Sequence, residues 1–211
     1  MNEPATAPLT PVEARIVASL FEKEATTPDT YPLTLNAIVL ACNQKTAREP
    51  TMELEPGDVA GTLRRLETRG WVKSQHTARA ERYQHRMEAV LGLTRPQTAL
   101  LALLMLRGPQ TAHELLARSE RLARFEGVDD VQYALERLSQ RTPALAVALP
   151  RQPGQRGERF AHLLCGEPDV GAVQAASAGG TSSLADRVAE LELRVADLEA
   201  RLSALTAERA D

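Results

Sequence analysis

Apolar residues recur along most of this chain at intervals of three and four, which is the spacing of amphipathic helices. Each group of three such segments is followed by two short runs in which apolar and polar residues alternate, as in extended strands. The expected helices span 11–25, 35–42, 58–69, 97–106, 112–119 and 129–141, and the expected strands span 71–75, 82–86, 144–149 and 159–164. This pattern predicts a mainly α protein with small β-hairpins, in the α+β class.

Local capping signals support the helix starts. Thr10-Pro11-Val12-Glu13 has the form of a capping box with proline in the first helical turn, and the threonine hydroxyl can accept from the Glu13 amide. Thr94 with Gln97 and Thr111 with Glu114 repeat the device. The helix that follows Thr94 is apolar nearly all round, so we expect it to be the most buried of the chain.

Three sequence blocks occur twice in the same order. Blocks 9–14, 58–66 and 81–85 return as 93–98, 130–138 and 158–162. Such a recurrence indicates a duplicated unit. Three helices followed by a basic hairpin resemble a winged-helix module, so the sequence predicts two tandem winged-helix domains, at 1–92 and 93–166. A fold resemblance alone does not establish function.

The third helix of the first copy is the predicted contact surface for duplex DNA. Thr62, Arg65 and Arg69 share one side of this helix, and Arg64 and Thr68 flank them. These arginines could pair with guanine edges or with phosphates. The alternative is an ordinary solvated helix face. Including the hairpin and the preceding loop, the predicted DNA-binding residues are Thr62, Arg64, Arg65, Thr68, Arg69, Lys73, Arg79, Arg82, Arg86, Lys45 and Arg48.

Two neighbouring segments have competing interpretations. The hairpin tip at 77–81, with Arg79, could approach a phosphate backbone as a wing or could be a solvated turn. The loop 43–50 offers amide, ammonium and guanidinium donors that suit phosphate or an acidic protein segment. Alternatively, its first residues cap the preceding helix, and Arg48 pairs with Glu49 or Glu53.

Charge and composition restrict the function further. The whole chain carries a formal net charge of −3, but residues 61–86 hold seven basic groups against two acidic ones, so a basic edge is present. Segments 1–92, 93–166 and 167–211 carry −1, +3 and −5. Aromatic residues make up only 3%, which disfavours a stacking platform for single-stranded nucleic acid.

Residues with catalytic or metal-binding chemistry are sparse. Cys42 and Cys165 are isolated and are expected to be buried or inert thiols. His85 and His162 occupy equivalent strand positions and are expected to pack against their neighbours. We find no phosphate-binding glycine loop, nucleophile elbow or paired carboxylates, so we expect no enzyme, no catalytic residue, no metal site and no cofactor.

The sequence also predicts a cytoplasmic location. The N-terminus lacks a basic and apolar signal segment, and the most apolar run, 99–106, is too short to span a bilayer. We therefore expect no membrane association.

The C-terminal segment has a heptad pattern. Residues 167–183, rich in Gly, Ala and Ser, are predicted to form a flexible linker, followed by a coiled-coil helix at 184–208. The predicted dimerisation residues are Leu184, Val188, Leu191, Val195, Leu198, Leu202 and Leu205. Arginines and glutamates flank this seam with the spacing of a parallel homodimer. The alternative is an amphipathic helix folded back on its own chain.

Several motifs resemble one family in particular. They are Glu22-Lys23-Glu24, Thr26-Thr27-Pro28-Asp29, Tyr31-Pro32-Leu33, Ala41-Cys42-Asn43-Gln44-Lys45, Arg48-Glu49-Pro50 and Glu81-Arg82-Tyr83-Gln84-His85-Arg86. Across about residues 9–165 the chain is similar to the YceH-like family of bacterial proteins. The resemblance implies tandem winged-helix domains, often with a C-terminal coiled coil, and implies no biochemical role.

The leading functional hypothesis is a dimeric protein that binds duplex DNA, of the kind that serves as a transcriptional regulator. The alternative is a tandem winged-helix scaffold that binds an acidic protein partner without contacting DNA. A small-molecule sensor is a weaker third hypothesis, because no apolar cavity can be identified from sequence.

Overall fold

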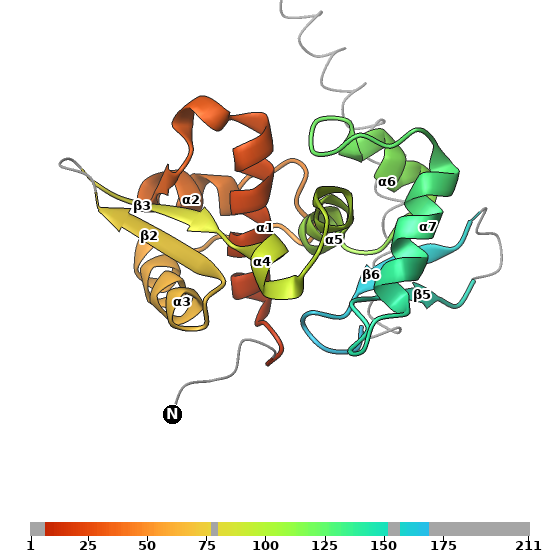
Figure 1. Ribbon diagram of the computed structural model, residues 1–211. Coiled ribbons are helices and arrows are strands. Elements are labelled where there is room, and N and C mark those ends of the chain that lie inside the picture. The colour runs from red at the N-terminus through yellow and green to blue at the C-terminus, as the bar shows by residue number, and fades with distance from the viewer. Residues whose placement is uncertain (1–6, 77–79, 152–156, 169–211) are drawn as a thin grey trace, which may run out of the picture. The chain divides into compact units, whose positions relative to one another are not determined.

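The computed structural model describes residues 7–76, 80–151 and 157–168 of the 211-residue chain, and these residues form one compact unit. They contain seven α-helices and two small antiparallel sheets, so the predicted α+β class is confirmed (Figure 1). Arg79, the linker 167–183 beyond Pro168 and the predicted coiled coil at 184–208 lie outside the described residues.

Both repeats contain a helix, a short strand, two helices and two strands in the same order, and the first repeat adds a 3-10 helix and α4. The first repeat comprises α1 (Pro11–Thr26), a short 3-10 helix (Pro28–Thr30), β1 (Leu33–Thr34), α2 (Leu35–Cys42), α3 (Pro56–Thr68), β2 (Val72–His76), β3 (Glu81–His85) and α4 (Met87–Leu91). The second repeat comprises α5 (Arg95–Arg107), β4 (Gln110–Thr111), α6 (Ala112–Ser119), α7 (Val128–Ser139), β5 (Ala146–Leu149) and β6 (Arg159–His162). The duplicated order predicted from sequence is confirmed.

Each repeat has a three-stranded sheet with the same topology. The strand orders are β1-β3-β2 and β4-β6-β5, so the last strand lies at the centre of each sheet. Tyr83 pairs with Leu33 on one side and Ser74 on the other, and Phe160 pairs with Gln110 and Ala148 in the same way. The pattern of apolar residues did not predict β1, β4 or α4, because these elements are too short to show a period.

The capping signals operate as expected. The Glu13 amide donates to the Thr10 hydroxyl at 3.2 Å, and the Thr10 amide donates to the Glu13 carboxylate at 2.8 Å. Thr111 and Glu114 form the same reciprocal pair. At the start of α5, the Thr94 amide donates to the Gln97 side chain at 3.2 Å. These local bonds explain why three helix starts could be predicted from the sequence.

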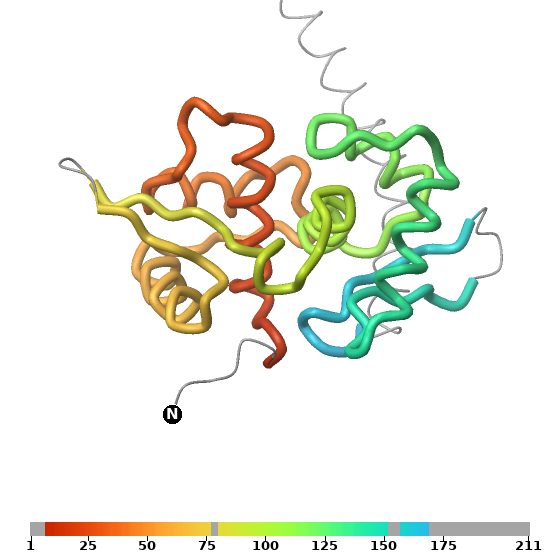
Figure 2. Tube along the Cα trace, in the orientation of Figure 1, coloured from red at the N-terminus to blue at the C-terminus, as the bar shows by residue number. Residues whose placement is uncertain are grey.

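The core is built around two central helices, α1 and α5. They lie side by side between the two sheets (Figures 1 and 2), and buried apolar residues from both repeats form one continuous cluster. Every residue of α5 from Thr98 to Leu106 is buried, which confirms the expectation for this helix. The domain boundary predicted at residues 92 and 93 stays a prediction. No helix among the described residues is long and apolar enough to cross a membrane.

Candidate nucleic-acid interface

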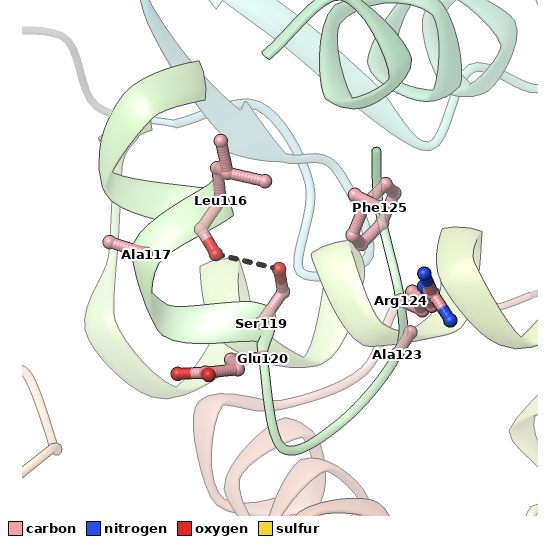
Figure 3. Close-up of a pocket in the computed structure, with 7 residues that line it drawn as sticks. All are labelled: Leu116, Ala117, Ser119, Glu120, Ala123, Arg124 and Phe125. Carbon is pink, nitrogen blue, oxygen red and sulfur yellow. Dashed lines mark hydrogen bonds between the residues drawn. The ribbon is translucent and has the colours of Figure 1, made fainter. Parts of the chain in front are cut away.

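The second repeat contains an open pocket of about 510 Å³ where α6 ends (Figure 3). Leu116 and Phe125 supply its larger apolar surfaces, and the Ser119 hydroxyl donates to the Leu116 carbonyl at 2.9 Å. Its charged side chains, Glu120 and Arg124, are both exposed. Because the Ser119 hydroxyl donates within its own helix, that donor is not available to a ligand in this pocket.

The solvent-facing side of α3 holds the exposed part of the predicted DNA-binding set. The opposite side of this helix packs Val59, Leu63 and Leu66 into the core. Arg64, Arg65 and Thr68 are exposed. Arg65 donates to the Thr62 hydroxyl at 2.8 Å, and its Nε lies 4.0 Å from Glu13, yet 61% of its side chain remains exposed. Arg64 has no carboxylate within ion-pair distance among the described residues, so its guanidinium is available.

The predicted exposure of Arg69 is wrong. Its side chain is only 3% exposed, Nη1 donates to Glu13 on α1 at 3.1 Å, and Nη2 donates to the Ala7 carbonyl. Arg69 does share a side with Arg65, and both approach Glu13, but α1 and the N-terminal segment cover its end of α3. Arg69 therefore stabilises the packing of α3 against α1 and cannot reach DNA in this structure.

The predicted exposure of Thr62 is also wrong. This residue is 2% exposed, and its hydroxyl donates to the Asp58 carbonyl one turn earlier at 2.8 Å. Because the same oxygen accepts from Arg65, Thr62 orients an exposed arginine rather than contacting a ligand itself.

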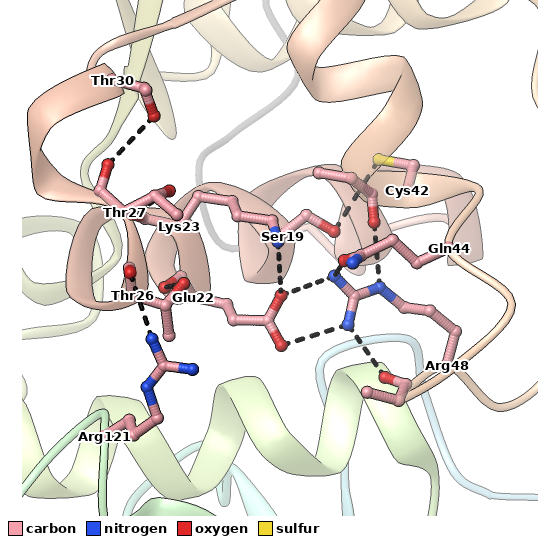
Figure 4. Close-up of polar contacts among 12 residues, drawn as sticks. Ser19, Glu22, Lys23, Thr26, Thr27, Thr30, Cys42, Gln44, Arg48 and Arg121 are labelled. Atoms are coloured by element: carbon pink, nitrogen blue, oxygen red, sulfur yellow. Dashed lines mark hydrogen bonds and ion pairs between the residues drawn. The ribbon is translucent and has the colours of Figure 1, made fainter.

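The loop between α2 and α3 is organised by a buried arginine (Figure 4). Arg48 is 4% exposed, and its Nη2 and Nη1 donate to the two carboxylate oxygens of Glu22 at 2.6 and 3.1 Å. It also donates to the Ala41 carbonyl and the Gln44 side chain. The predicted role of Arg48 in DNA binding is inconsistent with this burial. Its carboxylate partner lies on α1, and is neither Glu49 nor Glu53.

Two other polar residues complete this loop. The Asn43 side chain donates to the Leu54 carbonyl and accepts from the Leu54 amide, at 2.9 and 2.8 Å. Lys45 remains exposed and pairs with Glu53 at 2.6 Å. This exposed pair is screened by water and contributes little to stability. Most donors of the loop are therefore used within the protein.

The basic residues of the hairpin do not join the α3 surface. Successive side chains of a strand point to opposite faces, so Lys73 and Arg82 lie on the face opposite Ser74 and Tyr83. Arg82 donates to the Thr30 and Pro32 carbonyls at 3.2 and 2.7 Å, which ties β3 to the segment before β1. Lys73 is exposed, and so is Arg86, which follows β3.

A groove of about 580 Å³ separates α3 from the hairpin. Arg64 lines it together with Glu67, Glu81 and Tyr83. Hydrogen bonds from Ser74 hold the pKa of Glu67 below its ordinary value, and burial raises the pKa of Tyr83 to about 12. Because two carboxylates face the groove, a phosphate would be favoured at its arginine-bearing rim rather than at its floor.

The equivalent helix of the second repeat has a different surface. On α7, Glu136 occupies the repeat position of Arg64, and Tyr133 replaces Gly61 with a side chain that is 66% exposed. Arg137 is exposed, and Arg141 donates to the Leu91 carbonyl at 2.7 Å. The exposed surfaces of α3 and α7 therefore differ in charge and in apolar character.

A partly buried polar cluster that the sequence did not predict joins the repeats. Glu24 on α1 accepts from Arg95 of α5 and lies 3.1 Å from Nε2 of His85. The His85 ring meets Phe21 edge-on at 5.3 Å between ring centroids. Burial opposes ionisation of Glu24, but the hydrogen bonds from Arg95 and His85 outweigh it and lower its pKa. The expectation that His85 packs against its neighbours is confirmed.

The thiols and the second histidine are shielded. Cys42 is buried and Cys165 is partly buried, both are free, and burial raises the pKa of each to about 11. Desolvation lowers the pKa of His162 to about 4, and its buried Nδ1 has no hydrogen-bond partner. Within the part of the chain that the structure describes, no group of three or more His, Cys, Asp or Glu side chains could hold a metal ion.

Comparison with known proteins gives one consistent result. Residues 9–155 match the family model described as "Protein of unknown function, DUF480". The chain is 57% identical over 189 residues to "UPF0502 protein Smlt0097" of Stenotrophomonas maltophilia (strain K279a), with 86% of each chain covered. It is 54% identical over 204 residues to "UPF0502 protein xcc-b100_4348" of Xanthomonas campestris pv. campestris (strain B100), with 92% of this chain and 91% of the relative covered.

Proposed function

We propose a DNA-binding role for this chain, which belongs to the DUF480 family of uncharacterised bacterial proteins, whose members carry UPF0502 names. In this proposal each repeat is a winged-helix module, and the first repeat contacts duplex DNA through α3. The protein acts as a cytoplasmic homodimer and binds its target without catalysing a reaction.

One observation supports the proposal above the others. Arg64 and Arg65 are consecutive exposed residues of α3, and Arg64 has no carboxylate partner among the described residues. Guanidinium groups on the third helix of a three-helix unit are placed to meet phosphates or guanine edges in a major groove. Thr68 lies one turn after Arg64 and is exposed. Its hydroxyl donates to the Arg64 carbonyl at 3.0 Å, and its oxygen can still accept a hydrogen bond.

The contact surface is smaller than the sequence indicated. Arg69, Arg48 and Thr62 are buried, so the cations left to neutralise phosphates are Arg64 and Arg65 on α3 and, as a separate contact away from that surface, the exposed Lys73 or Arg86. Because each phosphate contact releases about 0.9 counterion, we expect log affinity to fall against log salt with a slope of about −2 to −3 per chain.

The decisive experiment is a salt series of gel shifts with the Arg64→Ala and Arg65→Ala double variant. We expect it to lose most of the affinity for duplex DNA at low ionic strength. A matched double variant in the second repeat, Arg124→Ala with Arg137→Ala, should bind as the wild type does. Absence of duplex binding by the wild type at low salt, or equal losses in both variants, would refute the proposal.

A second candidate function rests on α7. At the position equivalent to Arg64, α7 has the acidic residue Glu136, which makes this helix poorly suited to DNA. Its exposed Tyr133 suits a protein partner better, since tyrosine is enriched at interfaces. In this alternative the tandem modules form a scaffold. Tyr133→Ala should then abolish capture of a stoichiometric partner from nuclease-treated extract, whereas the α3 double variant should retain it.

A further inference from the structure

A cleft of about 330 Å³ lies between the repeats, where residues of α1 and the loop after α2 face residues of α5, α6 and the turn after α6. Lys23 of α1 lines it from the first repeat, and Arg107, Arg118 and Arg121 line it from the second. Its acidic lining residues are Glu22 and Glu120. The cleft therefore brings together basic side chains from α1, α5, α6 and the turn after α6. The first of these elements is distant in sequence from the others.

The carboxylate of Glu22 is already neutralised. Arg48 donates to both carboxylate oxygens of Glu22, at 2.6 and 3.1 Å, and the Lys23 ammonium lies 3.9 Å from the same carboxylate (Figure 4). Arg48 and Lys23 thus offset the charge of Glu22, which still favours the charged form of Arg107 but less than burial and Arg118 oppose it. Glu120 is exposed to solvent, where its charge is screened.

Arg107 has no internal counter-ion. Among the described residues, no carboxylate lies within ion-pair distance of its guanidinium and no hydrogen bond from it is formed, although the side chain is partly buried. Burial and the nearby charge of Arg118 both lower the pKa of Arg107. Arg118 itself is held by Gln110 at 2.6 Å and by Glu114 at 3.6 Å. Of these two neighbouring arginines, only Arg118 has a carboxylate partner, and the positive charge of Arg107 lacks one among the described residues.

Arg121 closes the cleft from the other repeat. Its guanidinium donates to the Thr26 carbonyl at the end of α1, at 3.3 Å, and leaves other N–H groups free to bind (Figure 4). Donors that converge from several elements suit a tetrahedral polyanion, because each phosphate oxygen can accept from a different direction. The volume is that of a small ligand site.

We propose that this cleft binds a small phosphorylated metabolite, whose phosphate groups lie between Arg107, Arg121 and Lys23. The ligand bridges the first and second repeats, so its binding stabilises their packing. This site is separate from α3 and does not depend on the proposed DNA binding.

The test uses the full-length protein and pyrophosphate as the probe, with calorimetry and thermal unfolding at ionic strength matched with chloride. We expect saturable binding and a raised Tm. ADP in a parallel titration distinguishes a nucleotide diphosphate from free pyrophosphate, and either one binding supports the proposal. Citrate tests the chemical class, and binding of citrate as tight as that of pyrophosphate would overturn it.

Variants locate the site. Arg107→Gln should weaken pyrophosphate binding about tenfold or more, as expected for loss of one charge-assisted hydrogen bond, and Arg107→Lys should restore part of it. Arg121→Gln, an exposed position, should weaken binding similarly and covers the case in which Arg107→Gln fails to fold. Arg137→Gln, outside the cleft, should bind as the wild type does.

Three results would refute the site. The first is that neither pyrophosphate nor ADP binds at concentrations up to about 10 mM. The second is unchanged binding by Arg107→Gln or Arg121→Gln, and the third is an equal loss of binding in Arg137→Gln. Displacement of pyrophosphate by duplex DNA that persists in the α3 double variant would instead assign the cleft to a nucleic-acid backbone.

Discussion

Equivalent arginines in the two repeats have different environments because their partners differ. Arg69 meets the carboxylate of Glu13 and is buried, whereas its counterpart Arg141 is exposed, and the second repeat has Gln97 in place of Glu13. An internal comparison of the repeats could therefore have indicated that Arg69 has a structural partner. The count of basic residues alone overestimated the accessible positive charge.

Replacing Arg69 should lower the free energy of unfolding rather than selectively weaken DNA binding. Arg69→Met leaves the buried carboxylate of Glu13 without its partner, which typically costs about 3–5 kcal/mol. Urea unfolding followed by circular dichroism measures this loss. The control Arg65→Met, at a largely exposed position, should change the free energy of unfolding by about 0.5 kcal/mol or less. Equal effects of the two substitutions would contradict the assignment.

His162 should make stability depend on pH. Its pKa is about 4 in the folded state against an ordinary value of 6.5, so the unfolded chain binds the proton first. The stability from keeping this ring neutral is fully present above pH 6.5 and is lost as the pH falls towards 4, by on the order of 3 kcal/mol. His162→Leu should flatten this part of the stability profile in urea titrations. The exposed His113→Leu should leave it unchanged.

At the scale of elements, local sequence signals were sufficient to predict a helix boundary where the interaction that sets it spans three or four residues. The predicted bounds of α2 and α6 match the structure, and the capping boxes at Thr10 and Thr111 are both formed. The short strands β1 and β4 were not predicted, because they exist only through pairing with β3 and β6, about 50 residues further along the chain. Such pairing leaves no periodic signal in a segment of two residues.

The cap of α1 should make a measurable contribution to stability. Thr10→Ala removes the hydroxyl that accepts from the Glu13 amide and should cost about 1 kcal/mol. Thr10→Ser keeps that acceptor and should retain most of the stability. Thermal or urea unfolding compares the three proteins, and a serine variant as unstable as the alanine variant would argue against the cap.

At the scale of the whole molecule, the two repeats are joined by packing between α1 and α5 and by shared polar contacts. Buried residues of both repeats belong to one apolar cluster, and Glu24 links α1 to Arg95 of α5. A backbone bond from the Leu9 amide to the Leu164 carbonyl, 2.7 Å long, also joins the start of one repeat to the end of the other. We therefore expect the repeats to unfold together.

A core substitution in the second repeat tests this cooperativity. Leu135→Ala should cost about 2–5 kcal/mol. Trp71, the only tryptophan of the chain, is buried in the first repeat and reports on that repeat by fluorescence. The Trp71 transition should shift to lower urea together with the circular dichroism signal. A Trp71 transition that stays at its wild-type midpoint would show two independent domains.

The C-terminal heptads predict the oligomeric state. If the seven predicted dimerisation residues from Leu184 to Leu205 form the parallel coiled coil expected from sequence, the chain should be a dimer. Truncation after Pro168 should then give a monomer in light scattering. Three heptads form a marginal coiled coil, so the wild-type dimer should dissociate on dilution. A truncated protein that stays dimeric would place the interface within residues 1–168.

Sequence alone determined the duplicated order of the longer helices and the hairpin strands, the capping boxes and the inward-facing residues Val59, Leu63 and Leu66, since these depend on interactions a few residues apart. Only the tertiary structure decided which basic side chains remain available. Arg69 and Arg48 find their carboxylates on α1, at sequence separations of 56 and 26 residues. A guanidinium is buried where a distant carboxylate offsets its desolvation, and that proximity exists only once the helices have packed.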